Sequence, residues 1–388
     1  MDFGFTQEQE AIREAIAKIC AQFGDDYWLK KDKEGGFPSE LHQALARDGW
    51  LGIAMPEDHG GAGLGITEAA IMMQTIAESG AGFSGASAVH MNIFGLNPVV
   101  VFGTAEQKKR MLPGLIAGKE RACFAVTEPN TGLNTTRIKT KAEKKGDKYI
   151  VSGQKVWIST AQIAEKILLL ARTTPIEECK KATQGLSLFY TDFDRSKVEV
   201  REIDKMGRKC VDSNQVFFDG MPIPEADRIG EEGKGFQYIL HGMNPERILI
   251  ASESVGLGRC ALNRATQYAK ERIVFDRPIG QNQGIQHPLA ANWMALEAAN
   301  LMVFKAAWLY DTGKPSGAEA NAAKYLAGEA GFDACQQAVM THGGFGYAKE
   351  YHVERWLRES LVGRIAPVSP QLVLCFIAER VLGLPKSY

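Results

Sequence analysis

The hydrophobic pattern of this chain changes period twice, and that change limits the folds that it can adopt. Up to about residue 120, apolar residues recur at helical spacing between glycine-rich loops. From 121 to about 225, short β-branched and aromatic runs alternate with turn residues, and from about 235 the helical spacing returns. Helices, then a compact block of strands, then helices again predict an α+β protein.

The pattern also predicts individual elements and three domains. We expect an N-terminal α-helical domain (1–120), a middle β-barrel domain (121–232) and a C-terminal α-helical bundle (233–388). Lys145-Gly146-Asp147 is expected at the tip of a hairpin. The main helices are predicted at 6–22, 39–48, 67–79, 106–116, 244–272, 289–312 and 318–341, and the strands at 149–159, 166–173, 185–193, 197–203 and 214–224.

Charge and cysteine usage exclude several classes of protein. A net charge of −1 indicates neither a nucleic-acid partner nor an anionic membrane surface, and the lysines of 139–148 are expected to solvate a hairpin. The seven cysteines form no CxxC pair, which favours a reducing compartment. The start MDFGFTQEQE is not typical of a targeting signal, and we find no apolar run close to eighteen residues. We therefore expect a cytoplasmic protein that does not insert into a membrane.

Familiar catalytic motifs are absent from the sequence. It contains no GxGxxG after a strand, no phosphate-binding GxxxxGK[ST], no HExxH and no GxSxG. The histidines are never spaced as metal ligands, and only His342, before two glycines, has a notable context. We expect neither a metal site nor a nucleophile–histidine triad.

Two polar stretches in the β region could bind a cofactor. The loop FAVTEPNTGLNTT (124–136) offers backbone N–H groups and hydroxyls that suit a ring carbonyl or a pyrophosphate, although an ordinary strand connection has the same composition. KVWIST (155–160) places Trp157 and Ser159 on one face of a predicted strand. These two side chains could stack on and hydrogen-bond a flavin, or Trp157 could be a core residue.

Glu246 has two possible roles. Asn244 as N-cap, Pro245 at the first helical position and Glu246 in the first turn predict a helix start. In that role Glu246 complements the positive end of the helix, which is worth about 0.3–1 kcal/mol. The alternative is a general base that faces a substrate.

These stretches together resemble the acyl-CoA dehydrogenase family. The resemblance runs from FTQEQEAIRE through PEDHGGAGLG, FAVTEPNTG, KTKAEKKGDKYIVSGQKVWIS and YAKERIVFDRPIGQNQGIQ to THGGFGYAKEYHVERWLRE. It implies the fold of that family, with a helical domain, a β domain and a C-terminal four-helix bundle. It also implies FAD as cofactor, an acyl-CoA substrate that is desaturated between its α and β carbons, electron-transfer flavoprotein as acceptor, and a homotetramer.

The resemblance also implies roles for individual residues. In the family the TEP stretch and the tryptophan-serine pair bind the flavin, and a loop of the C-terminal domain reaches the FAD of a neighbouring subunit. The implied cofactor-binding residues are Phe124, Val126, Thr127, Gly132, Leu133, Trp157, Ser159, Arg272, Phe275, Gln283, Met340, Gly343, Gly344, Ser369 and Gln371.

The resemblance places the catalytic base at Glu246. Many members carry the base in a C-terminal loop, where this chain has Pro367, which can accept no proton. The isovaleryl-CoA and long-chain types carry it on a helix within an E-R-L-type motif, which Glu246-Arg247-Ile248 matches. Arg247 is then expected to contact the CoA side of the substrate, with Asn244 and Leu133 as further substrate contacts.

Three departures from the family pattern leave alternatives open. Pro367 lacks the backbone N–H that donates to the thioester oxygen in relatives, so Val368 or the flavin ribityl hydroxyl would have to replace it. Leu133 replaces a serine, and Asp276 a glycine. A flavin monooxygenase or oxidase on the same fold, or a catalytically silent FAD- or acyl-CoA-binding relative, are the alternatives. The sequence does not define the acyl chain, nor whether the enzyme is degradative or biosynthetic.

Overall fold

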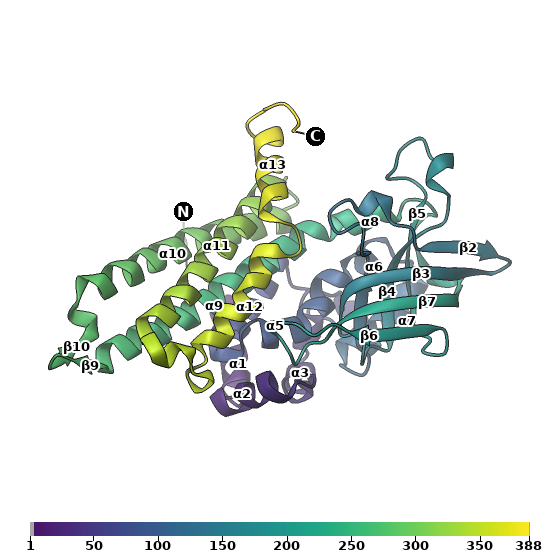
Figure 1. Cartoon of the computed structure of the whole chain (residues 1–388). Coiled ribbons are helices and arrows are strands. Elements are labelled where there is room, and N and C mark those ends of the chain that lie inside the picture. The colour runs from purple at the N-terminus through teal and green to yellow at the C-terminus, as the bar shows by residue number, and fades with distance from the viewer. Residues whose placement is uncertain (1–3, 388) are drawn as a thin grey trace.

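The structure, a computed structural model that describes residues 4–387, has three regions (Figure 1). A bundle of long helices extends to the left of the figure, a twisted sheet lies at the right, and the N-terminal helices pack between and below them. The predicted order of helices, strands and helices is therefore confirmed.

The N-terminal region consists of short helices around one apolar core. Thr6 caps the first helix as the sequence predicts, and its hydroxyl accepts from the N–H of Gln9. The second, fifth and sixth helices, which are short or rich in glycine, were not predicted from the sequence. The helices are α1 (Gln7–Cys20), α2 (Asp25–Glu34), α3 (Ser39–Arg47), α4 (Ile66–Ile76), the π-helical turn η3 (Ala77–Ala81), α5 (Gly82–His90), the π-helical turn η4 (Met91–Gly95), α6 (Asn97–Phe102) and α7 (Ala105–Ile116).

The middle region is a mixed sheet that runs in the order β6-β7-β3-β2-β4-β5-β8, with β1 parallel to β4. Gly146 and Asp147 turn between β2 and β3, with Lys145 opposite Lys148, so the predicted hairpin is confirmed. The strands are β1 (Ala122–Ala125), β2 (Lys141–Lys145), β3 (Lys148–Ser159), β4 (Lys166–Arg172), β5 (Leu186–Asp192), β6 (Val198–Glu202), β7 (Ser213–Pro224) and β8 (Arg228–Ile229).

Strand β3 is irregular where Trp157 lies. The register with β7 shifts between Lys155 and Ile158, and Trp157 has a left-handed φ of 63°. The simple alternation on which the sequence analysis placed Trp157 and Ser159 on one face is therefore broken. Trp157 is 59% exposed, so it is not a core residue.

The C-terminal region is a bundle of long helices that shares its core with the N-terminal helices. Ile248, Ala251 and Val255 are fully buried on one face of the first of its two 29-residue helices. A small two-stranded arm projects between two of the helices at the far left of Figure 1. The elements are α8 (Gly235–His241), α9 (Met243–Glu271), β9 (Ile273–Val274), β10 (Arg277–Pro278), α10 (Gln283–Asp311), α11 (Gly317–His342), α12 (Val353–Ile365) and α13 (Pro370–Arg380).

The start of α9 differs from the prediction. Gly242, not Asn244, is the N-cap, and the helix begins at Met243 because α8 ends directly before it at His241. Asn244, Pro245 and Glu246 still fall in the first turn. Proline is tolerated there because the first N–H groups of a helix have no intrahelical acceptor.

Two described stretches are long and apolar enough to be membrane spans by length and composition. The window in Ile66–Phe102 is 65% buried within the protein, as expected of core helices. Val353–Arg380 is only 11% buried, but it is divided by residues 366–369 into α12 and α13, of 13 and 11 residues. A spanning helix needs about 20 residues.

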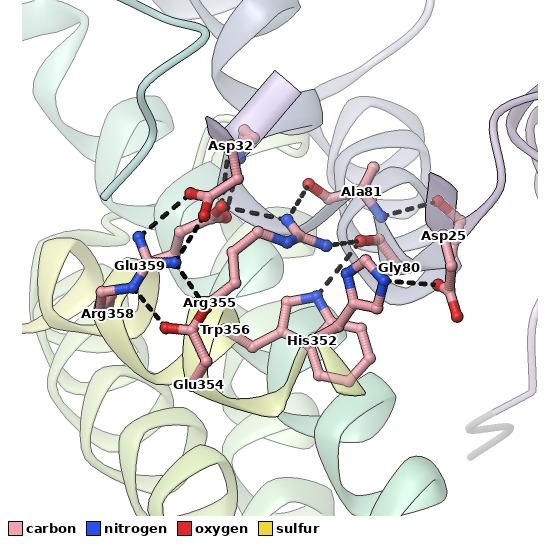
Figure 2. Close-up of polar contacts among 12 residues, drawn as sticks. Asp25, Asp32, Gly80, Ala81, His352, Glu354, Arg355, Trp356, Arg358 and Glu359 are labelled. Carbon is pink, nitrogen blue, oxygen red and sulfur yellow. Dashed lines mark hydrogen bonds and ion pairs between the residues drawn. The ribbon is translucent and has the colours of Figure 1, made fainter. Parts of the chain in front are cut away.

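A buried ionic junction fixes α12 against the N-terminal helices (Figure 2). The Arg355 guanidinium donates to the carbonyl of Gly80 at 2.6 Å and to Glu359 at 3.1 Å, and both side chains are almost fully buried. Arg358 pairs with Asp32 of α2 at 2.7 Å. Buried charges of this kind need their partners, because an unpaired one loses its hydration without compensation.

We predict that Arg355→Met destabilises the protein by about 3–5 kcal/mol, because it leaves Glu359 as a buried charge without its cation. Lys30→Met is the matched control, since it breaks an exposed pair with Glu34 worth only about 0.3–0.5 kcal/mol. Urea unfolding followed by circular dichroism compares the two variants. Equal unfolding midpoints for both would contradict the role given to this junction.

Candidate functional site

The carboxylate of Glu246 lies in a buried polar group at the start of α9. The residue is 7% exposed, and its Oε2 lies 2.6 Å from Nε2 of His90 at the end of α5. The other ring nitrogen of His90, Nδ1, is bound to Oε1 of Glu253. The two glutamates are seven residues apart on α9, which places them on one face of the helix, two turns apart.

The charges in this group shift one another's protonation. Burial alone would lower the pKa of the His90 imidazole, but the carboxylates of Glu253 and Glu246 outweigh it and raise that pKa to about 10. Burial raises the pKa of the Glu253 carboxyl, which is fully enclosed, and its Oε2 accepts no hydrogen bond within residues 4–387. The imidazole and the two carboxylates thus form one hydrogen-bonded group on a single face of α9.

Helix α5 carries a polar stripe through the core. Ser84, Ser87 and His90 are spaced by three and so lie on one side of the helix. Ser84 donates to Glu359 of α12 through its hydroxyl at 2.7 Å and its N–H at 3.0 Å. This anchor fixes the start of the helix whose last residue is His90.

Arg208 connects this stripe to the sheet. Its guanidinium donates to the hydroxyl of Ser87 at 3.0 Å and to that of Ser159 at 3.4 Å. Arg208 has a left-handed φ of 55°, which the surrounding contacts must maintain, and burial lowers its pKa. Arg208 thus ties the Ser159 hydroxyl, which is expected beside the flavin, to the same helix that carries His90.

The TEP loop is held from behind by a buried ion pair. Glu128 accepts from the backbone N–H groups of Lys139 and Thr140 at 2.7 and 2.8 Å, and from the Lys155 ammonium at 3.0 Å. Lys155 also donates to the carbonyl of Val126 at 2.9 Å. Burial lowers the pKa of Lys155 to about 8, although Glu128 opposes the shift.

Most of the cofactor contacts expected on the sheet lie around this loop. Gly132 has open space where a side chain would be, and Leu133 is 61% exposed. The Thr131 hydroxyl is buried without a hydrogen-bond partner in the described part of the chain. The residues in this set are Phe124, Val126, Thr127, Gly132, Leu133, Trp157 and Ser159.

A second set of expected cofactor contacts lies at the opposite end of the molecule. Arg272, Met340, Gly343 and Gly344 line an open hollow of about 530 Å³ between the arm and the end of α11. Phe275 extends from the arm and is 94% exposed, and Gln283 is exposed at the start of α10. His342 also lines the hollow, stacked on Tyr268 with ring centroids 4.1 Å apart.

The two sets are separated by the length of α9. Glu246 lies near the start of this 29-residue helix and Arg272 directly follows its end. At 1.5 Å per residue the helix is about 44 Å long. One chain therefore cannot place Arg272 and Glu246 at the same flavin ring.

The remaining predicted residues lie near the start of α9 or at the start of α13. Arg247 donates to the side-chain oxygen of Asn244 at 3.3 Å, and its Nε is buried without a partner among the described residues. The hydroxyl of Ser369 caps α13 by accepting from the N–H of Leu372 at 3.3 Å. Gln371 is exposed in the first turn of the same helix.

Three residues of this site, His90, Glu253 and Arg208, were missed by the sequence analysis. His90 is the sole ionisable side chain in the stretch SGASAVHMNIFGLNP, and Glu253 interrupts an apolar run seven residues after Glu246. Both are charged groups on otherwise buried helical faces, which is the signal that could have identified them.

Among residues 4–387 no three acidic, cysteine or histidine side chains are grouped so as to hold a metal ion.

Comparison with known proteins identifies the family. The N-terminal, middle and C-terminal domains of acyl-CoA dehydrogenases match residues 6–119, 123–221 and 233–382. The chain therefore belongs to the acyl-CoA dehydrogenases, a family of flavoprotein oxidoreductases, and has their fold, as the resemblance predicted.

Individual relatives match over nearly the whole chain. Acyl-CoA dehydrogenase FadE12 of Mycobacterium tuberculosis is 39% identical over 99% of this chain and 98% of its own. The subunit CarC of the caffeyl-CoA reductase–Etf complex of Acetobacterium woodii is 33% identical over 97% and 99%. The structure of glutaryl-coenzyme A dehydrogenase with glutaryl-CoA superposes with a TM-score of 0.94 at 27% identity, over 100% of this chain and 98% of that one.

We predict that Glu128→Gln destabilises the β domain by about 3–5 kcal/mol and weakens flavin retention, because the Lys155 ammonium stays buried without its anion. Glu143→Gln, which removes the carboxylate of an exposed ion pair on β2, is the matched control. The measurements are the thermal unfolding midpoint and the flavin absorbance that remains after gel filtration. If both variants behave like the wild type, the ion pair does not hold the loop.

Proposed function

We propose that this protein is a cytoplasmic, FAD-dependent acyl-CoA dehydrogenase that converts an acyl-CoA thioester to a trans-2-enoyl-CoA and passes the electrons to an electron-transfer flavoprotein. Glu246 is the base that removes the α-proton, within the three domains 1–120, 121–232 and 233–388. The observation that carries the proposal is the burial of the Glu246 carboxylate next to His90 in a flavoprotein whose alternative base position is Pro367.

Burial favours the base over the helix-start role for Glu246. If Glu246 only complemented the positive end of α9, it would need no burial. First-turn glutamates that are exposed to solvent on a protein surface already fill that role. Enclosure costs the carboxylate its hydration. A base that must attack a weakly acidic α-proton gains from that enclosure, because the ionised form is less stabilised by solvent.

The residues of the sheet fit a flavin. Trp157 and Leu133 are large apolar side chains left exposed beside open space at Gly132 and the unpartnered Thr131 hydroxyl. A planar, partly polar ring would cover the side chains of Trp157 and Leu133. It would also supply hydrogen-bond partners for the backbone at Gly132 and for the Thr131 hydroxyl. When bound, FAD would supply the acceptor for the hydride that leaves the β-carbon. The hydroxyl of Ser159, fixed by Arg208, would face the ring.

The start of α9 offers a cationic site for the CoA side of the substrate. Arg247 is mostly buried. Burial lowers the pKa of the neighbouring Lys324 to about 8. Glu329 opposes this shift, and the positive charges of Arg247 and Arg364 add to it. An anionic or strongly polar group of the substrate would relieve this repulsion. Asn244 and Leu133 are the further substrate contacts that we propose.

The thioester oxygen needs a donor that Pro367 cannot provide. Residues 366–369 join α12 to α13. Of the two neighbours of Pro367, Ala366 already donates its N–H to the carbonyl of Val362 at 2.9 Å, so we look to the N–H of Val368. Loss of one such donor elsewhere costs about 2.7–4 kcal/mol of transition-state stabilisation. We therefore assign Val368 as the replacement.

The distance between the two sets of cofactor contacts supports a homotetramer with shared FAD sites. Within one chain Arg272 and Phe275 lie a helix length away from Glu246, so they would serve the FAD of a neighbouring subunit. The bundle also exposes an apolar stripe along α10 that a second copy would cover. Its members are Trp293, Met294, Leu301 and Trp308, each more than half exposed.

We predict that Glu246→Gln abolishes reduction of the flavin by acyl-CoA while FAD and acyl-CoA still bind. Glu319→Gln, a first-turn glutamate of α11, is the matched control, because a helix-start role alone would make the two variants equivalent. Anaerobic absorbance measurements with a series from butyryl-CoA to palmitoyl-CoA, straight and branched, supply the readout. Activity of Glu246→Gln above a few per cent of wild type, roughly a loss of under 2 kcal/mol, would exclude the assignment.

Shared sites predict complementation between two inactive variants. Glu246→Gln lacks the base and Arg272→Ala lacks the arm contact, so each homo-oligomer should be inactive or nearly so. Co-expressed in one cell, the two chains form mixed oligomers in which some sites combine an intact base with an intact arm. Recovery of activity in the purified mixed oligomer is expected. Absence of recovery, although both chains co-purify, would contradict the sharing of sites.

A further inference from the structure

Both ring nitrogens of His90 are engaged by carboxylates of the same helix. Nε2 lies 2.6 Å from Glu246 Oε2, and Nδ1 is bound to Glu253 Oε1. A neutral imidazole carries one N–H and could donate to only one of two ionised carboxylates. An imidazolium donates to both, so the geometry favours a cation between two anions.

An imidazolium alone would be a poor neighbour for a base. Its positive charge stabilises the ionised form of Glu246 and so opposes removal of a proton from substrate. Glu253 supplies the compensating charge from the other side of the same ring. The His90–Glu253 pair is then neutral as a unit. Glu246 therefore keeps the N–H of His90 as a fixed hydrogen-bond donor, while the charge of Glu253 offsets most of the positive charge on that ring.

We propose that His90 is a positioning residue for Glu246, and that Glu253 balances the charge of His90 so that Glu246 is held in place without losing its strength as a base. This inference rests on the proposed function, because it assigns to the two residues a part in the action of that base. Nε2 of His90 binds Oε2 of Glu246, and we assign the other carboxylate oxygen, Oε1, to the substrate.

The surroundings of the ring contain few other charges. Arg208, from the loop between β6 and β7, partly offsets the charge of Glu253. The hydroxyl of Ser87 on α5 binds Arg208 and not the ring. Within the described residues, the carboxylates of Glu253 and Glu246 are the charges that raise the pKa of His90. The protonation of this group therefore follows mainly from Glu246, His90 and Glu253.

Two substitutions, one of His90 and one of Glu253, distinguish a positioning role of His90 from a purely structural one. His90→Gln removes the cation and leaves Glu253 as a like charge near Glu246, so the acidic limb of the rate–pH profile should move to higher pH. Glu253→Gln removes the balancing anion, so the same limb should move to lower pH. We expect each variant to reduce the rate of flavin reduction about 10- to 100-fold without a comparable change in KM.

The measurement is anaerobic flavin reduction, as a function of pH, by whichever member of the butyryl- to palmitoyl-CoA series reduces the wild type fastest. His241→Gln is the matched control, since this exposed histidine of α8 binds Asn97 and lies outside the group. It should leave the acidic limb unchanged. Shifts of the two variants in the same direction, or no shift in either, would overturn the proposal.

A second readout does not depend on turnover. In FAD-loaded protein labelled with nitrogen isotope at its histidines, NMR at about pH 8 should show one imidazolium, although an ordinary histidine is neutral there. That signal should vanish in His90→Gln and persist in Glu253→Gln, where Glu246 still accepts from the ring, and in His241→Gln. A neutral ring in the wild type would overturn the proposal.

The two readouts distinguish this inference from the proposed function. If no acyl-CoA reduces the wild-type flavin although dithionite does, the dehydrogenase function fails, and the role of His90 in catalysis fails with it. The NMR signal then still decides whether His90 is the cation shared by the two glutamates. If acyl-CoA reduces the flavin but the two shifts are not opposite, only the inference about His90 fails.

Discussion

The hydrogen bonds from Ser84 to the buried carboxylate of Glu359 fix helix α5, and the arrangement of the site depends on that helix. One turn later Ser87 binds Arg208, which reaches the Ser159 hydroxyl of the sheet, and one turn after that His90 bridges the two glutamates of α9. Three parts of the chain are thus aligned by one line of polar contacts. Buried polar contacts favour one arrangement of these elements, because any other arrangement would leave more of the groups without a partner.

The length of α9 has a second consequence for the molecule. Its start holds Glu246, and its end carries the β9–β10 arm at the far side of the helix bundle (Figure 1). The open hollow and the exposed Phe275 lie at that far end. A rigid helix cannot fold back to bring its two ends together. Under the proposed function, assembly of several copies would let both ends contribute to one cofactor, and the exposed apolar stripe of α10 is a surface suited to such assembly.

Much of the fold could be predicted from the sequence because it depends on local pattern. The change of period identified the strands and long helices, and Thr6 and Gly146 marked a helix start and a hairpin turn. Local pattern failed where a neighbouring element took precedence: α8 moved the N-cap of α9 to Gly242, and the register shift beside Trp157 broke its alternation. Such effects depend on contacts that no local window contains.

The site was predictable only in part, for the same reason. The position of Glu246 followed from the family motif, but its partner His90 lies 156 residues away in the chain. A lone histidine in an apolar helix gives no indication of which carboxylates it meets until the helices are packed. Glu253 carried a clearer signal, because a second glutamate on the same buried face of α9 requires a partner.

The central claim is that Glu246 removes the α-proton of an acyl-CoA thioester. The most direct measurement compares anaerobic single-turnover flavin reduction by an acyl-CoA with that by the same compound deuterated at its α-carbon. If Glu246 breaks this bond in the step that reduces the flavin, the deuterated substrate reacts severalfold more slowly. Dithionite should reduce the flavin equally fast in both samples. Equal rates for the two acyl-CoAs would contradict the account, because removal of the α-proton would then not be part of the step that transfers the hydride.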